Sequence, residues 1–155
     1  MNIIQAQTDK HIHDARILFR EYETVLGVDL CFQRFEEELA NLPGKYAPPH
    51  GSLLLAESDN GVAGCAAMRK IAGHFCEMKR LFVRPPYRGL GIGRMLAQEI
   101  ICRARHSGYR IMYLDTLETL ERAIALYQSL GFKETDPYYD NPLDGVVYLK
   151  LDLRT

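Results

Sequence analysis

Apolar residues recur at helical spacing in two segments near the start of the chain. In residues 9–26 they fall every third or fourth position, which places them on one face of a helix. Thr8 or Asp9 can cap the start of this helix, and Gly27 ends it. A second apolar stripe runs through residues 32–42 and is stopped by the pair Pro43-Gly44. We therefore predict two helices, at 9–26 and at 32–42.

The middle of the chain changes to the patterns of β-strands. Apolar runs at 52–57 and 62–71 are separated by Asp59-Asn60-Gly61, and Asn-Gly is a strong signal for a hairpin turn. A second turn at Ala72-Gly73 leads into another apolar run at 75–83. These three strands are therefore expected to lie side by side in an antiparallel arrangement.

Helical and strand patterns alternate through the second half, and no repeat, low-complexity tract or flexible linker interrupts the chain. A helix that ends at Gly108 is followed by a strand, and a helix that ends at Gly131 precedes the last strand. The second half is thus expected to form a helix from after Gly93 to about 107, a strand at 110–115, a helix at 119–130 and a strand at 146–153. A short strand at 3–7 is expected to open the chain. This order predicts an α/β fold, in which a mixed sheet carries helices on both faces, and a single domain over 1–155.

Composition and charge exclude several classes of function. Of the 155 residues, 47% are hydrophobic and 25% are charged, which is typical of a globular protein. The net charge of −1 gives no basic surface of the kind that nucleic-acid binding requires. No apolar run is long enough to span a membrane, and the first residues lack the basic and apolar regions of a signal peptide. We therefore expect a cytoplasmic protein with neither a nucleic acid nor a membrane as partner.

The cysteines form no metal-binding pattern. Cys31, Cys65, Cys76 and Cys102 show no CxxC spacing, and no cluster of histidines stands beside them. We expect free thiols, as in a reducing compartment, and no metal site.

The segment Arg88-Gly89-Leu90-Gly91-Ile92-Gly93 stands between a predicted strand and a predicted helix. Its glycines let the backbone approach a ligand closely and adopt conformations that a Cβ disfavours. Successive N–H groups at a helix N-terminus attract phosphate oxygens, and Arg88 and Arg94 add positive charge. The segment predicts a pyrophosphate site, with a purely structural turn as the alternative.

Two common phosphate-binding fingerprints do not fit this segment. Counted from Gly89, the sixth position of G-x-G-x-x-G holds Arg94 instead of glycine. The Gly-Lys-Ser/Thr ending of a Walker loop is absent as well. Neither fingerprint therefore identifies the phosphate ligand of this segment.

Two blocks of the sequence resemble signatures of the GNAT superfamily of N-acetyltransferases. After the strand Met78–Val83, the arrangement Arg88-x-x-Gly91-x-Gly93 is similar to the acyl-CoA motif of that family, and Ala123–Phe132 is similar to its C-terminal signature. The blocks follow each other in the family's order, and the resemblance covers nearly the whole chain. It implies a mixed, mostly antiparallel sheet in which the fourth and fifth strands splay apart.

The resemblance also implies an activity and a cofactor. The expected enzyme transfers the acetyl group of acetyl-CoA to a primary amine by direct attack in a ternary complex, without a metal. Backbone N–H groups of the fourth strand would face the pantetheine arm and the thioester carbonyl, and the glycine segment would hold the pyrophosphate of coenzyme A. The cofactor-binding positions are Leu81, Phe82, Val83, Arg88, Gly89, Leu90, Gly91, Ile92, Gly93, Arg94 and Tyr127.

The family's catalytic roles fall on two residues. Tyr127 matches the tyrosine that protonates the departing thiolate, and Glu77 stands where several members place a general base. Core packing is the alternative for Tyr127, and a solvated strand position beside Lys79 is the alternative for Glu77. A water relay remains open as the base. Leu120 stands where many members have an asparagine, so the contacts of that side chain are not expected here.

The acceptor is the least specified part. In the family it lies against the first two helices and the loops near the last strands, which here offer Tyr22, Phe32, Tyr138 and Tyr139. Acidic and tyrosine-rich walls favour a small cationic amine, and a solvated, turn-rich connection is the alternative. Small molecules and peptides both remain open as acceptors.

Other functions remain open beside the enzyme. The chain could be a CoA-binding sensor or regulatory module without efficient turnover, or a nucleotide-binding protein unrelated to acyl transfer. A homodimer is implied by the family resemblance alone.

Overall fold

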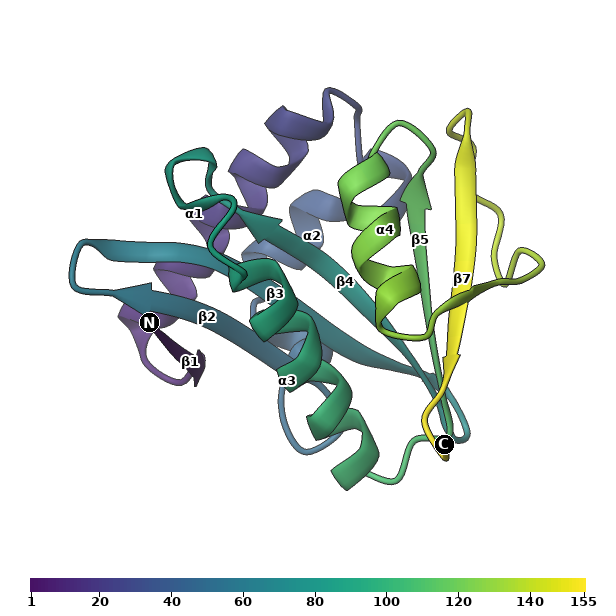
Figure 1. Cartoon of the computed structure of the whole chain (residues 1–155). Coiled ribbons are helices and arrows are strands. Elements are labelled where there is room, and N and C mark those ends of the chain that lie inside the picture. The colour runs from purple at the N-terminus through teal and green to yellow at the C-terminus, as the bar shows by residue number, and fades with distance from the viewer.

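A computed structural model describes all 155 residues. One seven-stranded sheet runs through the molecule in the order β1-β2-β3-β4-β5-β7-β6 (Figure 1). Every neighbouring pair is antiparallel except β4 and β5, which are parallel. The strands are β1 (Asn2–Gln5), β2 (Ser52–Ser58), β3 (Gly61–Ala72), β4 (Phe75–Val83), β5 (Ile111–Leu117), β6 (Lys133–Glu134) and β7 (Val146–Asp152).

Helices cover both faces of this sheet, with α1 and α2 on one face and α3 and α4 on the other (Figure 1). This arrangement confirms the predicted fold class. Not one of the helices combines the length and the apolar character that crossing a membrane requires. The helices are α1 (Asp9–Leu26), α2 (Phe35–Ala40), α3 (Ile92–His106) and α4 (Glu121–Ser129), with short 3-10 turns at Cys31–Gln33, Gly44–Tyr46 and Pro85–Tyr87.

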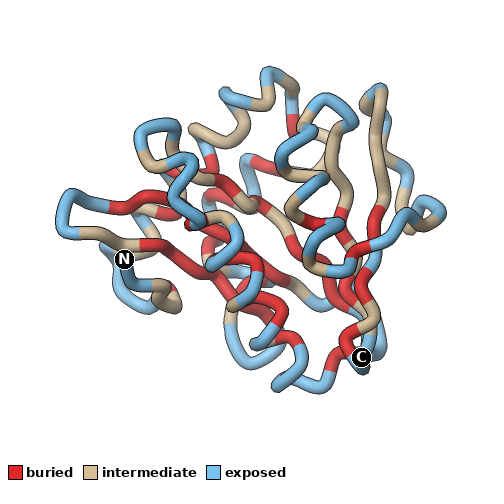
Figure 2. Tube along the Cα trace, in the orientation of Figure 1, coloured by how far each residue is buried: buried red, intermediate tan, exposed pale blue.

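Two apolar cores hold the helices to the sheet. Along β2, Leu54 and Ala56 belong to the core under α3 and α4, while Leu53 and Leu55 belong to the core under α1 and α2. This alternation is the two-residue period of a strand that is buried on both faces. Figure 2 shows the buried residues concentrated along the central strands. Each fully buried leucine contributes about 1.5–3 kcal/mol relative to an exposed one.

The segment predicted as one helix at 32–42 is the main difference from the sequence-based expectation. A 3-10 turn ends at Gln33, Arg34 takes a left-handed conformation with φ of 58°, and α2 follows for 6 residues. This break turns the chain so that Phe35 and Leu39 both reach the core under α1 and α2. The prediction of a continuous helix was wrong because an apolar stripe does not reveal a turn inside it.

The sheet parts between β4 and β5, as the family resemblance implied. The two strands pair only where Phe75–Glu77 lies beside Ile111–Tyr113. Beyond these residues the strands diverge (Figure 1). The pairing of β4 with its other neighbour, β3, shows why. Cys65 pairs with Phe82 and Ala67 pairs with Lys79, so two residues of β4 lie opposite one residue of β3 between these pairs. Such a bulge bends a strand and increases its twist.

Arg80 stands at this bulge, with φ of 60° although it is not a glycine. Its guanidinium donates from Nε and Nη2 to the two carboxylate oxygens of Glu38, at 2.9 and 2.8 Å. The side chain is buried, and its guanidinium carbon lies 5.2 Å from the centre of the Phe35 ring. A left-handed conformation is costly for a residue with a Cβ, so this buried pair holds the bulge in place.

The pair Arg80–Glu38 is expected to be important for stability. Glu38→Ala should lower the free energy of unfolding by about 3 kcal/mol, because it leaves a buried guanidinium without its carboxylate. Glu36→Ala is the matched control, since Glu36 lies in the same helix and binds Arg20 through two hydrogen bonds at the surface. That variant should leave stability nearly unchanged. Urea denaturation of both variants measures the difference, and equal losses would contradict the role given to the buried pair.

Candidate active site

A cavity opens where β4 and β5 part. Its walls come from Met78–Leu81 on β4, Leu114–Leu117 on β5, Tyr22 on α1, and Ala123 with Tyr127 on α4. We call it the splay cavity; its volume is about 70 Å³. The strand divergence that the bulge produces thus creates a mostly apolar space that reaches from the α1 side of the sheet to the α4 side.

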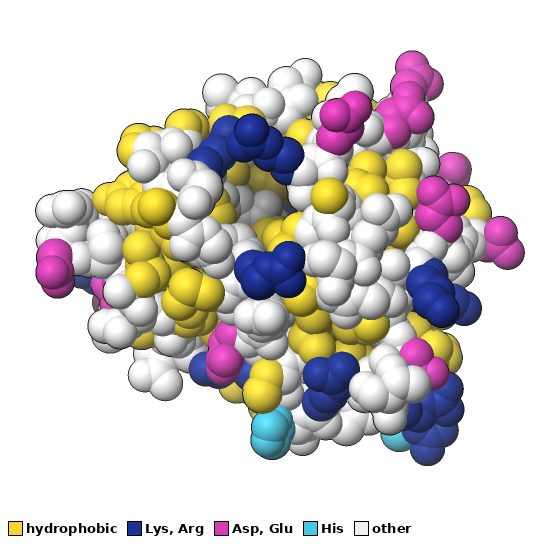
Figure 3. Space-filling view, viewed as in Figure 1, with side chains coloured by type: hydrophobic (Ala, Val, Ile, Leu, Met, Phe, Trp, Pro, Cys, Tyr) yellow, Lys and Arg dark blue, Asp and Glu magenta, His cyan; other side chains and the backbone are white.

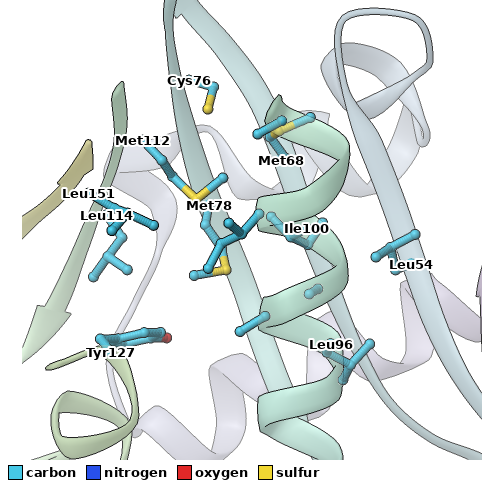
Figure 4. Packing of buried hydrophobic residues seen from close by; sticks show 14 of the residues in the cluster. Leu54, Met68, Cys76, Met78, Leu96, Ile100, Met112, Leu114, Tyr127 and Leu151 are labelled. Carbon is cyan, nitrogen blue, oxygen red and sulfur yellow. The ribbon is translucent and has the colours of Figure 1, made fainter. Parts of the chain in front are cut away.

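Tyr127 extends from α4 into the core beside this cavity. Figure 4 shows its hydroxyl end directed away from α4, on the side of Met78. The ring meets that of Phe132 edge to face, with the ring centres 5.7 Å apart. The hydroxyl makes no hydrogen bond to another residue, and burial raises the pKa of Tyr127 well above its usual range. The group therefore keeps its proton at neutral pH, and its hydroxyl has no partner within the protein.

The glycine segment folds as the sequence predicted. Gly89 and Gly91 have φ of 82° and 80°, and Gly91 is the N-cap of α3. The N–H groups of residues 89–94 donate to no backbone carbonyl. Unpaired N–H groups at the start of a long helix attract an anion, since the helix dipole adds partial positive charge there. A Cβ built on Gly93 would lie 3.7 Å from both Val83 and Leu126, so the glycine leaves this space free.

Two arginines flank the segment. Arg88 donates from Nε to the carbonyl of Val83 at 3.0 Å. Arg94 donates from Nη2 to the hydroxyl of Ser129 at 2.7 Å, which links the start of α3 to the end of α4. Figure 3 shows Lys and Arg side chains bordering a hollow on the face that carries α3 and α4. The surroundings of the free N–H groups are therefore positively charged.

The predicted cofactor-binding residues divide between the two faces of the sheet. Leu81 and Val83 pack against the core under α3 and α4, on the same side as Tyr127. Phe82 points the other way, into the core under α1. Leu90 is 67% exposed and Ile92 is buried. Contact of these residues with a cofactor stays a prediction, and for Phe82 it could only involve the backbone.

Glu77 lies on β4 on the α1 side, and both of its carboxylate oxygens are occupied. Arg69 donates from Nε to Oε1 at 2.8 Å, and the hydroxyl of Tyr138 donates to Oε2. Lys79 Nζ is 3.9 Å from Oε1. The carboxylate is buried but does not line the splay cavity. The structure therefore does not bring Glu77 and Tyr127 into one cavity.

A second, larger cavity lies beside the first, between α2, the 3-10 turn before it, and strands β3 and β4. We call it the α2 cavity; its volume is about 400 Å³. Glu77 and Arg69 line it, and it shares Gln33 and Lys79 with the splay cavity. Gln33 and Lys79, which are hydrogen-bonded to each other at 3.2 Å, thus stand between the two cavities.

The four predicted acceptor residues are placed differently. Tyr22 lines the splay cavity, and burial raises its pKa to about 12. Phe32 and Tyr139 line the α2 cavity, while Tyr138 lines neither and binds Glu77. Contact of these residues with an acceptor stays a prediction.

Sequence reasoning missed Asp115, the carboxylate that lines the splay cavity together with Tyr127. Its Oδ2 accepts hydrogen bonds from the hydroxyl of Tyr139 and from Asn141 Nδ2, the latter at 2.8 Å. Gln33 Nε2 in turn donates to the Tyr139 hydroxyl at 3.0 Å. The one available signal was a charged residue at the end of an apolar strand, which is also common in strands that simply reach solvent.

Comparison with known proteins agrees with this geometry. The model of the acetyltransferase (GNAT) family matches residues 12–132. An uncharacterized N-acetyltransferase of Schizosaccharomyces pombe is 46% identical over 155 residues, which cover 99% of this chain and 95% of that protein. A GNAT-family acetyltransferase of Staphylococcus aureus Mu50 superposes with a TM-score of 0.82 at 21% identity, over 98% of both chains, and so has the same fold.

A structure with a ligand is also similar. A GNAT-family acetyltransferase of Elizabethkingia anophelis with acetyl-CoA bound has a TM-score of 0.57 and 24% identity, over 66% of this chain and 76% of that one. The match of the family model and the full-length relative confirm the resemblance that the two sequence blocks indicated. The chain belongs to the GNAT family of acetyltransferases.

Proposed function

We propose that the protein transfers the acetyl group of acetyl-CoA to a primary amine. The observation that carries this proposal is the Tyr127 hydroxyl, which is buried at the cavity between β4 and β5, holds its proton and has no partner within the protein. A general acid must still carry its proton when the leaving group departs, and a hydroxyl without a partner within the protein can turn toward that group. The related protein from Elizabethkingia anophelis, which has acetyl-CoA bound, supports the choice of cofactor.

The residues present fit coenzyme A. The unpaired N–H groups of residues 89–94 would hold its pyrophosphate, with Arg88 and Arg94 as mobile counter-charges. The pantetheine arm would follow the edge of β4 that β5 leaves unpaired, where the backbone of Leu81–Val83 offers hydrogen bonds. When bound, acetyl-CoA supplies an acetyl group activated as a thioester.

Transfer requires that the amine lose a proton and that the sulfur gain one. A lysine-like amine of pKa about 10.4 needs roughly 4 kcal/mol to be neutral near pH 7.4, whereas a thiol of pKa about 8.5 needs only roughly 1.5 kcal/mol to leave as thiolate. Tyr127 holds the proton for the sulfur, and a backbone N–H of β4 would orient the carbonyl. Taking the proton from the amine is the more demanding part when the amine is strongly basic.

Two carboxylates could take that proton. Glu77, the residue proposed from the family position, borders the α2 cavity; because both of its oxygens are already hydrogen-bonded, it would act through a water. Asp115 is the second candidate, favoured by its place in the same cavity as Tyr127. Its Oδ2 is occupied by Tyr139 and Asn141, which leaves Oδ1 to receive a proton.

Replacing Tyr127 tests the general acid. Tyr127→Phe should lower kcat by about tenfold while the KM for acetyl-CoA stays the same, because the sulfur must then leave unprotonated at a cost of roughly 1.5 kcal/mol. Steady-state kinetics with acetyl-CoA and an amine panel, followed by thiol release, measure both constants. A large rise in the KM for acetyl-CoA with normal kcat would contradict the role of acid. Binding of acetyl-CoA without turnover of any amine in the wild type would instead indicate a CoA-binding module.

Filling the space beside Gly93 tests the cofactor site. Gly93→Val should still fold, since its Cβ meets only ordinary contacts, but the larger side chain should weaken CoA binding about tenfold or more. Calorimetric titration with CoA measures the affinity. Ala125→Val, at an exposed position of α4, is the matched control and should bind CoA like the wild type. Unchanged affinity in Gly93→Val would place the cofactor elsewhere.

Parallel variants decide between the two carboxylates. If Glu77 takes the proton, Glu77→Gln should reduce kcat/KM for the amine by about 100-fold and Asp115→Asn should have a small effect. The reverse order would assign the proton to Asp115. Thermal melting and the KM for acetyl-CoA are measured for both variants, so that a loss of fold is recognised as such.

A further inference from the structure

The side chains around the α2 cavity carry more positive than negative charge. Three carboxylates line the cavity, and each is already bound to an arginine. The pairs are Arg34–Glu37, Arg80–Glu38 and Arg69–Glu77, with N–O distances of 2.7, 2.8 and 2.8 Å. No carboxylate of this cavity is therefore left to receive a cationic group of a substrate.

Neither of the two lysines of the same cavity is hydrogen-bonded to a carboxylate. Lys45 is exposed and takes part in no ion pair. Lys79 donates from Nζ to Gln33 Oε1 at 3.2 Å, and its distance of 3.9 Å from Glu77 Oε1 is beyond a hydrogen bond. The side chain of Lys79 is only 9% exposed. The surplus charge of the cavity is positive, and the buried part of it is the ammonium group of Lys79.

Lys79 lies at the junction of the two cavities, because it lines both of them. If the acceptor approaches from the larger α2 cavity, its amine would reach the acetyl group beside Tyr127 at the junction of the two cavities. A charged group attached next to the amine nitrogen would then lie at the junction, close to Lys79. A charge far from the amine would instead lie toward Lys45 at the surface.

We propose that the acceptor is an amine with a carboxylate beside the amine nitrogen, as in a free amino acid, and that Lys79 binds this carboxylate. The inference rests on the proposed acetyltransferase function and names its substrate class. It differs from the expectation of a small cationic amine, because the three carboxylates that line the α2 cavity are each paired with an arginine. A peptide N-terminus or an amide would leave the ammonium group of Lys79 with Gln33 as its one hydrogen-bond partner and without a carboxylate within hydrogen-bond distance, which disfavours such substrates.

Matched pairs of substrates test the proposal. Each pair consists of an amino acid and its carboxamide, and the ratio of their kcat/KM values is compared between the wild type and Lys79→Gln. This comparison cancels the difference in basicity between the two amines. Removing a hydrogen bond to a charged group should lower the ratio about tenfold or more in Lys79→Gln. Lys133→Gln, an exposed residue of β6 that lines neither cavity, is the control and should keep the wild-type ratio.

A second measurement avoids any variant. A carboxylic acid that lacks the amine but keeps the rest of the amino acid should inhibit the wild type competitively against the acceptor, and its carboxamide should inhibit about tenfold less or not at all. Equal inhibition by both compounds, or an unchanged substrate ratio in a folded Lys79→Gln, would overturn the proposal.

The panel includes simple amines without a carboxylate, so that the two proposals can fail separately. If no amine of any kind is acetylated, the proposed acetyltransferase function fails, and the acceptor class fails with it. If simple amines or carboxamides are acetylated at least as well as the amino acids, the function stands and the acceptor class is overturned.

Discussion

The buried pair between Arg80 and Glu38 is the contact on which the site depends. The pair holds Arg80 itself in a left-handed conformation, which is unusual for a residue with a Cβ, and this conformation makes the bulge of β4. The bulge shifts the side-chain alternation of the strand. Lys79 lies on the α1 side of the strand with Glu77 and lines both cavities, while Leu81, two residues further on, packs against the core on the other face. One strand thus serves both sides of the reaction that we propose.

The same bulge explains why the backbone of β4 is available to a ligand. After Glu77 the strand has no partner on the side of β5, so its outward N–H and C=O groups lie along a mostly apolar cavity. Buried backbone groups without partners are costly, and proteins retain them where a ligand or water completes the hydrogen bonds. The open edge and the unpaired N–H groups of residues 89–94 are two such places on one molecule. Both would be satisfied by one long ligand with a polar arm and a diphosphate.

Local signals in the sequence predicted much of this structure. The stripe of α1 has its cap at Thr8 and its end at Gly27, and the left-handed glycines at 89 and 91 lie where the motif placed them. The features that were missed depend on distant partners. The conformation of Arg80 depends on Glu38, which is 42 positions away in the chain. No periodicity or turn propensity encodes such a contact, because the pattern of a strand is the same with or without a bulge inside it.

The loop between β6 and β7 shows how distant contacts shape the candidate site. Neighbouring residues of this loop bind carboxylates on the two strands that part: Tyr138 donates to Glu77 on β4, and Tyr139 donates to Asp115 on β5. Beyond Glu77 the two strands no longer pair with each other, so the loop connects them where their own hydrogen bonds have ended. Gln33 extends the connection from Tyr139 to the segment before α2. The width of the splay cavity is therefore set by side chains of a loop as well as by the sheet. A residue pattern could place a tyrosine pair in this loop, but only the folded chain shows that the pair joins the two strands.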